Sequence, residues 1–386
     1  MLADLAMLTK RLGLRVTVSI PNLAKDIDLK DTLRVAGVYI GTIIGAGYAS
    51  GQEILQFFTG YGWWGIIGTL VTMVMYPLLG YYLIVLGKRV KAASHKGVIY
   101  HICGKYLGAI VDILLAFFLF GVGVIMIAGS GSLFQQQFGI EPALGYALMS
   151  VLVILALLLS LRRVLNVIST LTPFAFALVI VLAGYAALTA DPAGVDLEAV
   201  AATQEDLASP HWLLSAFLHV SFNVAITVSV MAMMGATERN YRAAKRGAVL
   251  GGIALGAFAL IINLAMYFNI TDVVGVDMPM LMIANEVHPF IGAAMALVLL
   301  AMIFNTAVPM FYSFTARFFT VETRGFRIAA VIVGLAGFGF GFIGFTELVG
   351  RVYPLLGYVG FVIFGAMAIN LIRHRREPTV SQTSGQ

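Results

Sequence analysis

The run Gly41-Thr42-Ile43-Ile44-Gly45-Ala46-Gly47-Tyr48-Ala49-Ser50-Gly51-Gln52-Glu53 places four glycines, an amide and a carboxylate inside an apolar segment long enough to cross a membrane. A helix in hydrocarbon must satisfy its backbone internally, and a carboxylate at depth costs roughly 2.5–3.5 kcal/mol or more. Interrupted helices of this kind line substrate and ion sites at mid-membrane. We therefore predict an interruption within residues 44–51 with a polar cavity beside it. Glycines that only let helices pack closely are the alternative.

The composition supports a membrane setting. The 386 residues are 60% hydrophobic and 11% charged, and the mean hydropathy is +0.95, whereas a soluble domain is about 25% charged. The single cysteine, Cys103, excludes an internal disulfide. We expect an all-α polytopic membrane protein.

Apolar stretches of spanning length occur ten times along the chain. Their approximate bounds are 33–59, 62–87, 106–138, 141–161, 164–188, 211–237, 246–269, 288–318, 326–346 and 348–372. No signal peptide is evident. Residues 1–20 mix Leu and Met with basic residues, which favours an amphipathic helix on the inner membrane surface or, equally, a dispensable extension.

The basic residues predict the orientation. With the N-terminus inside, every Lys and Arg except Arg351 lies on the cytoplasmic side, while the outer loop 189–210 contains five acidic residues and no Lys or Arg. We expect both termini in the cytoplasm and the protein in the cytoplasmic (inner) membrane of a prokaryote. The pI of about 9.2 then follows from topology and requires no nucleic-acid partner.

Ten spans divide into two sets of five, and an odd number per set inverts the second relative to the first. The expected units are a cytoplasmic segment 1–30, a first repeat 31–188, the acidic extracellular loop 189–210, a second repeat 211–373 and a disordered cytoplasmic tail 374–386. Span 6, first in its half, has polar residues where span 1 has glycines, so we expect helices 1 and 6 to be discontinuous.

These features together resemble a known family. The stretch 41–47 resembles the Gly-x-Gly break in the first helix of the LeuT-type five-plus-five fold, found in the amino acid–polyamine–cation superfamily. The stretch 48–54 resembles the bacterial YkvI-like membrane proteins. The resemblance covers residues 31 to about 373. It implies a small-molecule substrate, typically an amino acid or amine, bound at the interrupted centres of spans 1 and 6.

The resemblance also implies site residues. The substrate would meet span 1 and the unwound part of span 6, at Gly45, Ala46, Gly47, Tyr48, Ser221, Phe222 and Asn223. Na⁺, where it is the coupling ion, would lie between the carbonyls of Gly41 and Ile44 and the side chains of Asn305 and Thr306. Asn305 departs from the paired hydroxyls that the family often has there. No other metal or cofactor is expected, and protein partners cannot be inferred.

Several of these side chains have simpler alternatives. Thr306 can bond its own helix backbone, and Asn223 can join two helices. His219 can carry a proton near neutral pH or be structural. Glu53 and Arg351 are expected to meet as an external gate; otherwise Glu53 binds substrate or a cation, and Arg351 meets Glu347 or lipid head groups.

Asp112 is expected to pair with a cytoplasmic Lys or Arg. No sequence motif of a metalloprotease, a serine hydrolase or a phosphate-binding loop is present, so an enzyme or an ATP-driven pump is not expected. We expect an ion-coupled secondary transporter that works by alternating access, with H⁺ or Na⁺ as the coupling ion. The alternative is a transporter-fold ligand sensor, like a germinant-receptor subunit, without net transport.

Overall fold

The computed structural model describes residues 21–91, 95–158, 176–321 and 323–375. The expected amphipathic segment 1–20, the first part of the fifth span and nearly all of the tail 374–386 lie outside these residues. The described chain is helical and contains no strand, so the all-α expectation is confirmed for this part.

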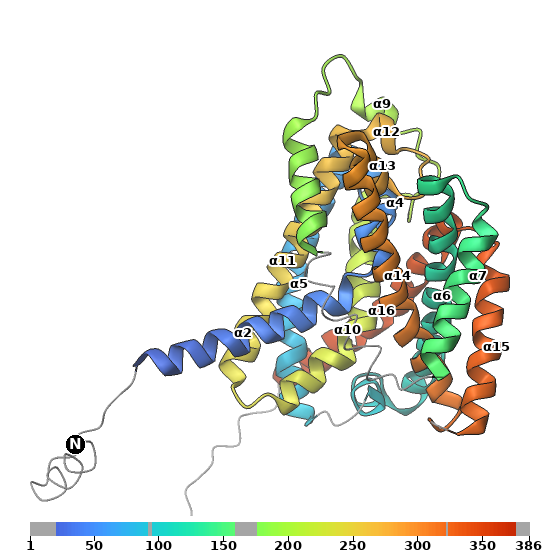
Figure 1. The fold of residues 1–386 in the computed structure, drawn as a ribbon. Helices are drawn as coiled ribbons and strands as arrows, with labels where there is room; N and C mark the ends of the chain where they lie inside the picture. Colours follow the sequence, from blue (N-terminus) through green and yellow to red (C-terminus); the bar gives the residue numbers. More distant parts are fainter. Residues whose placement is uncertain (1–20, 92–94, 159–175, 322, 376–386) are drawn as a thin grey trace, which may run out of the picture.

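The helices follow the order of the expected spans (Figure 1). The first span consists of α2 (Pro21–Ile43), α3 (Ala46–Ala49) and α4 (Gln52–Phe57). The remaining elements of the first half are η1 (Thr59–Tyr61), α5 (Trp63–Val90), α6 (His95–Phe138), α7 (Pro142–Leu158) and the helical stretch Phe176–Thr189. Those of the second half are α9 (Leu197–Ala201), α10 (Trp212–Thr237), α11 (Tyr241–Phe268), α12 (Ile270–Val273), α13 (Pro279–Val287), α14 (Pro289–Phe318), α15 (Arg324–Gly341) and α16 (Phe345–Arg375).

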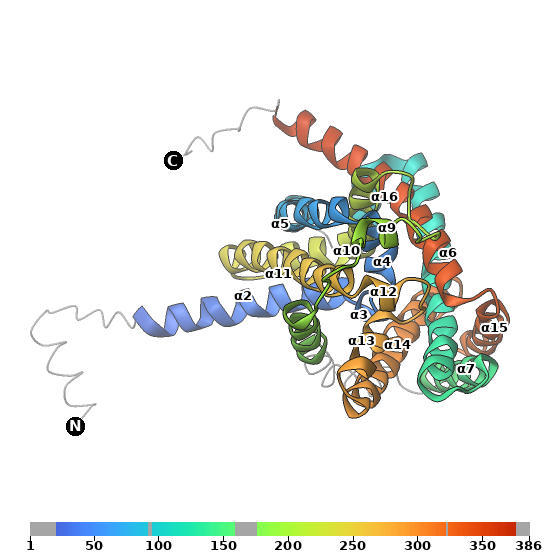
Figure 2. The same ribbon diagram turned by 90° about the horizontal axis from the view of Figure 1, so that it is seen from above.

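Six described helices are long and apolar enough to cross a membrane, and α10 is a seventh if its two bent parts form one span. The other three expected spans coincide with the broken stretch α2–α4 and with the shorter apolar helices Pro142–Leu158 and Phe176–Thr189. Helix α2 begins at Pro21, before the expected boundary, and its first turns project from the body (Figures 1 and 2). The ten-span inverted repeat stays a prediction.

The helices form two groups, visible from above (Figure 2). Helix α5 packs against α10 and α11, and α11 packs against α2; α6 packs against α7 and α14, and α15 packs on α7. Helix α16 packs against α10 of the first group and α6 of the second. The groups therefore contain spans 1, 2, 6 and 7 on one side and spans 3, 4, 8 and 9 on the other.

Glycines set the close approach within the first group. A Cβ on Gly87 of α5 would overlap the backbone carbonyl of Ala232 in α10, and one on Gly252 of α11 would overlap the backbone at Pro77 of α5. Small residues allow membrane helices to pack at such distances, where van der Waals contact replaces the missing hydrophobic driving force.

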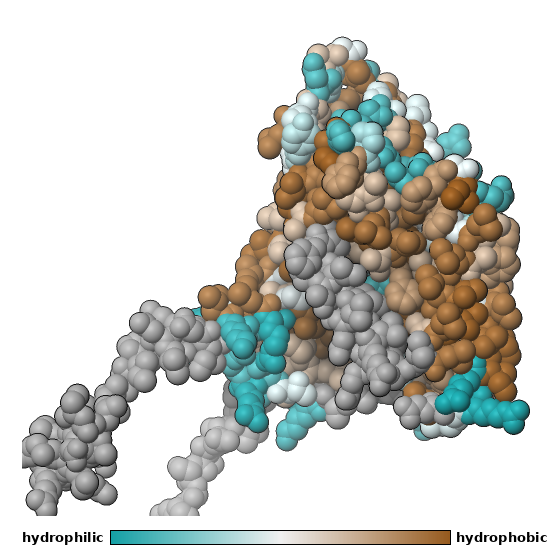
Figure 3. Space-filling view, viewed as in Figure 1, coloured by the Kyte–Doolittle hydropathy of each residue, from teal (hydrophilic) through white to brown (hydrophobic). Residues whose placement is uncertain are grey.

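The surface shows how the protein would sit in lipid. A broad hydrophobic region covers the side of the molecule, with hydrophilic residues gathered at its two ends (Figure 3). Large apolar side chains such as Ile332 on α15 and Val151 on α7 are more than half exposed. The basic residues Lys88 and Arg89 end α5, at the end of the molecule where α10 turns into α11. The basic residues from which the sequence predicts a cytoplasmic side therefore include a group at one end of the molecule.

Candidate functional site

The first span is interrupted twice. Helix α2 ends at Ile43, the single turn α3 ends at Ala49, and α4 begins at Gln52. Gly51 between the short helices has a φ of 86°, a left-handed conformation that glycine adopts without a steric penalty. The interruption predicted within residues 44–51 is therefore confirmed.

The interruption changes the backbone hydrogen bonding. The last helical bond of α2 runs from the amide of Ile44 to the carbonyl of Ile40, and the next bond of this type runs from Ala49 to Gly45. The carbonyls of residues 41–44 therefore receive no amide from a following helical turn in this part of the chain. Oxygens released in this way are ligands for a monovalent cation in interrupted transporter helices.

A cavity of about 260 Å³ opens beside the interruption. Nine of the residues singled out from the sequence line it: Gly41, Ile44, Gly45, Ala46, Gly47, Glu53, Phe222, Asn305 and Thr306. The structure thus brings the glycine run of span 1 to the middle of α14. The approach is close, because a Cβ on Gly45 would lie 3.1 Å from the Thr306 hydroxyl oxygen.

The Thr306 hydroxyl donates to the Met302 carbonyl at 2.9 Å. Such a bond to its own helix backbone was the alternative expected for Thr306 in place of ion binding. This bond uses the hydroxyl proton only, so an oxygen lone pair stays free to face a cation.

Span 6 differs from the expectation. The segment Ser221–Val224, expected to be unwound, is helical, and α10 is assigned as one helix from Trp212 to Thr237. It bends by 49° around residue 229 instead. The expected discontinuity is therefore wrong at 221–224, because no glycine or proline lies there to release the backbone. Phe222 contributes only its ring, which stacks on Tyr353 with centroids 4.9 Å apart.

Three expected substrate ligands face elsewhere and do not line the cavity. The Tyr48 hydroxyl donates to the carbonyl of Leu255 at 3.1 Å, and the Ser221 hydroxyl donates to that of Gly357 at 2.7 Å. Asn223 bonds the Tyr76 hydroxyl at 3.0 Å. Tyr48 and Ser221 join helices, and Asn223 belongs to a buried polar chain.

That chain ends at Glu53. His219 Nε2 and Glu53 Oε1 lie 2.9 Å apart, and His219 Nδ1 lies 3.0 Å from the Tyr76 hydroxyl. The side chain of His219 is fully buried and that of Glu53 is 5% exposed. The His219 ring lies among the aromatic rings of Phe57, Phe58 and Phe222.

The expected external gate is absent. Arg351 bonds Glu347 at 2.6 Å, one turn away on α16, and its side chain is 73% exposed. Glu53 instead points inward to His219. The pairing of Glu53 with Arg351 is therefore wrong for this structure, because each charge has a nearer partner. The expectation for Asp112 is confirmed: its carboxylate accepts a hydrogen bond from Arg317 at 2.7 Å.

Two tyrosines beyond the expected site residues, Tyr76 and Tyr353, belong to this region. Tyr76 joins the polar chain, and Tyr353 lines the cavity. Each stands directly before a proline inside an apolar helix. A tyrosine deep in such a helix, beside a residue that weakens it, is a signal that the sequence does carry.

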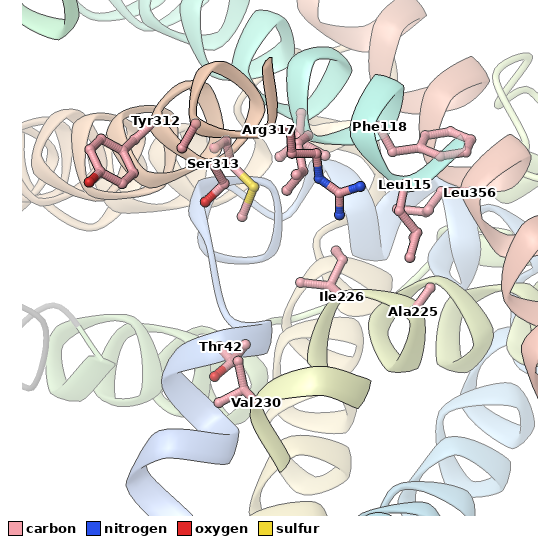
Figure 4. Close-up of a pocket in the computed structure, with 14 residues that line it drawn as sticks. Thr42, Leu115, Phe118, Ala225, Ile226, Val230, Tyr312, Ser313, Arg317 and Leu356 are labelled. Carbon is pink, nitrogen blue, oxygen red and sulfur yellow. The ribbon is translucent and has the colours of Figure 1, made fainter. Parts of the chain in front are cut away.

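A second, larger pocket of about 560 Å³ adjoins the cavity. The two share Thr42, Ile226 and Met310. Figure 4 shows Arg317 extending into this pocket, with Ile226 and Ala225 of α10 opposite. Arg317 lies in the last turn of α14, so the pocket leads from the interruption toward the end of the molecule that carries Lys88, Arg89 and Arg317, the basic end. Among the described residues, no group of three or more His, Cys, Asp or Glu is placed to hold a metal ion.

The fold is shared with solved transporters. Mhp1 in an inward-facing conformation matches with a TM-score of 0.61 and 14% identity, over 90% of this chain and 78% of that chain. MhsT in complex with L-phenylalanine matches with a TM-score of 0.56 and 16% identity, over 89% of this chain and 97% of that chain. A Na⁺-coupled sialic acid symporter in a substrate-bound outward-open state matches with a TM-score of 0.54 and 15% identity, over 87% of this chain and 77% of that chain. The chain therefore has the LeuT-type transporter fold.

Within this class the chain is similar to particular bacterial proteins. The uncharacterized membrane protein YkvI of Bacillus subtilis (strain 168) is 28% identical over 349 residues, which cover 89% of this chain and 97% of that protein. The uncharacterized protein YyaD of the same organism is 24% identical over 324 residues, covering 84% and 92%. No protein-family model matches the chain. The resemblance to the YkvI-like membrane proteins is confirmed.

Proposed function

We propose that the protein is an ion-coupled secondary transporter of a small organic solute, an amino acid or an amine, and that it works by alternating access. The observation that carries the proposal is the cavity at the interrupted first span, lined by residues 41–47, Asn305 and Thr306. An interrupted helix beside a polar cavity is the arrangement in which secondary transporters hold a solute and an ion.

The solute would occupy the cavity between the glycine run and the rings of Phe222 and Tyr353. Its volume of about 260 Å³ suits a small molecule and falls below the roughly 300–1,000 Å³ of drug-sized sites. A Na⁺ ion would lie where the carbonyls of Gly41 and Ile44 approach Thr306. The Na⁺-coupled sialic acid symporter of the same fold makes this ion a reasonable candidate.

The two helix groups supply the moving parts. Spans 1, 2, 6 and 7 would rock against spans 3, 4, 8 and 9, with the cavity between them. The adjoining pocket that reaches Arg317 supports an arrangement open toward the basic end. With that end in the cytoplasm, as the basic residues favour, this is an inward-facing state in the inner membrane of a prokaryote.

Reconstitution into proteoliposomes tests the proposal. Purified protein is first screened for thermal stabilisation by amino acids and amines, with and without Na⁺ and at several pH values. The best ligands are then followed as radiolabelled solutes in counterflow, which requires transport but no ion gradient. Exchange above that of protein-free liposomes supports a transporter. Ligand binding without any exchange contradicts it and identifies a sensor.

A further inference from the structure

Glu53 has two oxygens in different environments. Oε1 is bonded to His219. Oε2 lies beside Gly47, 3.1 Å from the position of a Cβ there, and the Tyr353 hydroxyl lies at the same distance from that position. Glu53, Gly47 and Tyr353 all line the cavity. Oε1 is therefore bonded to His219 on the side away from the cavity, and Oε2 lies at the cavity wall.

The hydrogen bonds behind Glu53 have a defined direction. The amide nitrogen of Asn223 donates to the carbonyl of His219 at 2.9 Å and to the Tyr76 hydroxyl at 3.0 Å. With its oxygen accepting from Asn223, the Tyr76 hydroxyl has its proton available for Nδ1 of His219, 3.0 Å away. Nε2 of a neutral imidazole then carries the other proton and donates it to Oε1 of Glu53. In this tautomer, the bonds from Asn223 to Tyr76, from Tyr76 to His219 and from His219 to Glu53 all point toward the carboxylate.

This direction leaves one place for a further proton. Oε1 can accept the hydrogen bond from His219 whether Glu53 is charged or neutral. Protonation at Oε2 therefore leaves the bonds Asn223–Tyr76, Tyr76–His219 and His219–Glu53 unchanged. In the described part of the chain, the phenols of Tyr48, Tyr76 and Tyr353 lie near Glu53, and His219 is bonded to it. In the described chain no Lys or Arg forms an ion pair with it. An ionised Glu53 leaves a net negative charge in a buried site, and such a charge is costly within a membrane.

We infer that Oε2 of Glu53 is the proton-binding site of the transport cycle, and that His219, Tyr76 and Asn223 are positioning residues that hold it toward the cavity. The inference rests on the proposed function and deepens it by naming H⁺ as a coupling ion. One proton from the aqueous side adds to the Oε2 carboxylate oxygen and gives a neutral carboxylic acid. The same proton leaves from Oε2 when the cavity opens to the other side.

The cavity provides the exit. It adjoins the larger pocket through Thr42, Ile226 and Met310, so water in that pocket would reach the cavity wall from the basic end. The fully buried side of His219 offers no such route. A proton released from Oε2 therefore moves toward Arg317 and not through the aromatic rings around the histidine.

Glu53→Gln is the decisive variant. The glutamine oxygen still accepts from His219, and its amide nitrogen replaces Oε2 without a titratable proton. Because glutamine resembles the neutral form of Glu53, we expect the variant to keep measurable solute exchange in counterflow, although its solute affinity can change. It should lose the solute accumulation that a proton gradient drives. In wild type, one charge moved across 100 mV corresponds to a roughly fifty-fold ratio of solute concentrations across the membrane. Glu347→Gln removes a carboxylate of the exposed pair with Arg351 and serves as the matched control, with accumulation retained.

The outcomes separate the alternatives. Accumulation by Glu53→Gln at the wild-type level, or wild-type accumulation that a protonophore leaves unchanged, overturns the inference. Loss of binding and counterflow together with accumulation makes Glu53 a solute ligand and also overturns it. His219→Gln should retain counterflow and shift the pH profile of accumulation, because it changes the support of Oε1 only. An unchanged profile refutes the positioning role.

A measurement without solute keeps this test independent of transport. Infrared difference spectra of the purified protein between acidic and alkaline buffers should contain a carboxylic-acid band in wild type and Glu347→Gln. The band should be missing in Glu53→Gln. If no solute is transported but the band is present, the proposed function fails and the proton site stands. If the band is identical in all three proteins, the proton site is wrong.

Discussion

Gly45 and Thr306 face one another so closely that a Cβ on the glycine would lie 3.1 Å from the threonine hydroxyl oxygen. One residue belongs to the interruption of the first span and the other to the middle of α14, and both line the same cavity. This contact connects the two helix groups that alternating access would move apart. The cation site that we propose between spans 1 and 8 would lie at this contact.

Replacing Thr306 tests that site. We expect Na⁺ to stabilise the wild-type protein against thermal unfolding, and Thr306→Val to weaken Na⁺ binding by more than the ~1 kcal/mol of an ordinary hydrogen bond. Thr306→Ser keeps the hydroxyl and should retain the Na⁺ response. Equal responses of the Val and Ser variants would remove the hydroxyl from the site.

A methyl group on Gly47 should reduce solute binding. Its Cβ would lie 3.1 Å from both Glu53 Oε2 and the Tyr353 hydroxyl oxygen, so these cavity-lining groups must shift. We expect Gly47→Ala to lower solute affinity by about tenfold or more, equivalent to 1.4 kcal/mol, in a binding assay. Gly41→Ala is the control in the same segment, because its Cβ meets no atom within 4 Å. Equal losses in both variants would mean that glycine flexibility matters and the contact does not.

Removal of Arg351 should have little effect. Its pair with Glu347 is exposed at 73% and 45%, and such surface pairs contribute about 0–1 kcal/mol. Arg351→Ala is therefore expected to unfold at nearly the wild-type temperature and to exchange solute at nearly the wild-type rate. A severe loss of exchange with normal stability would restore an external gating role, formed in another conformation.

Close helix packing should be sensitive at Gly87. A Cβ there would collide with the Ala232 backbone carbonyl, and overpacking typically costs 1–3 kcal/mol. Thermal unfolding in detergent should show a clear loss of stability for Gly87→Ala. Gly37→Ala places its methyl group where no atom lies within 4 Å and should be neutral or slightly stabilising. The prediction is contradicted if the two variants unfold alike.

The sequence predicted the interruption of the first span for a local reason. Four glycines, an amide and a carboxylate within thirteen residues conflict with a continuous helix in hydrocarbon, whatever the rest of the chain does. The same reasoning failed for span 6. Polar side chains alone do not break a helix: the Ser221 hydroxyl and the Asn223 amide nitrogen find partners on neighbouring helices while the backbone stays helical.

The tertiary structure decided which polar side chains on different helices bond to each other. The sequence identified Glu53, His219 and Arg351 as unusual, and Glu53 paired with His219 while Arg351 paired with Glu347. Hydropathy and glycine content are properties of a local stretch of sequence, so their effects can be predicted without knowing the fold. The pairing of buried polar groups depends on which helix faces meet and how closely they approach, and the glycine contacts between α5, α10 and α11 set that geometry. The sequence by itself determined a membrane protein with an interrupted first span, and only the packing decided which side chains surround the break.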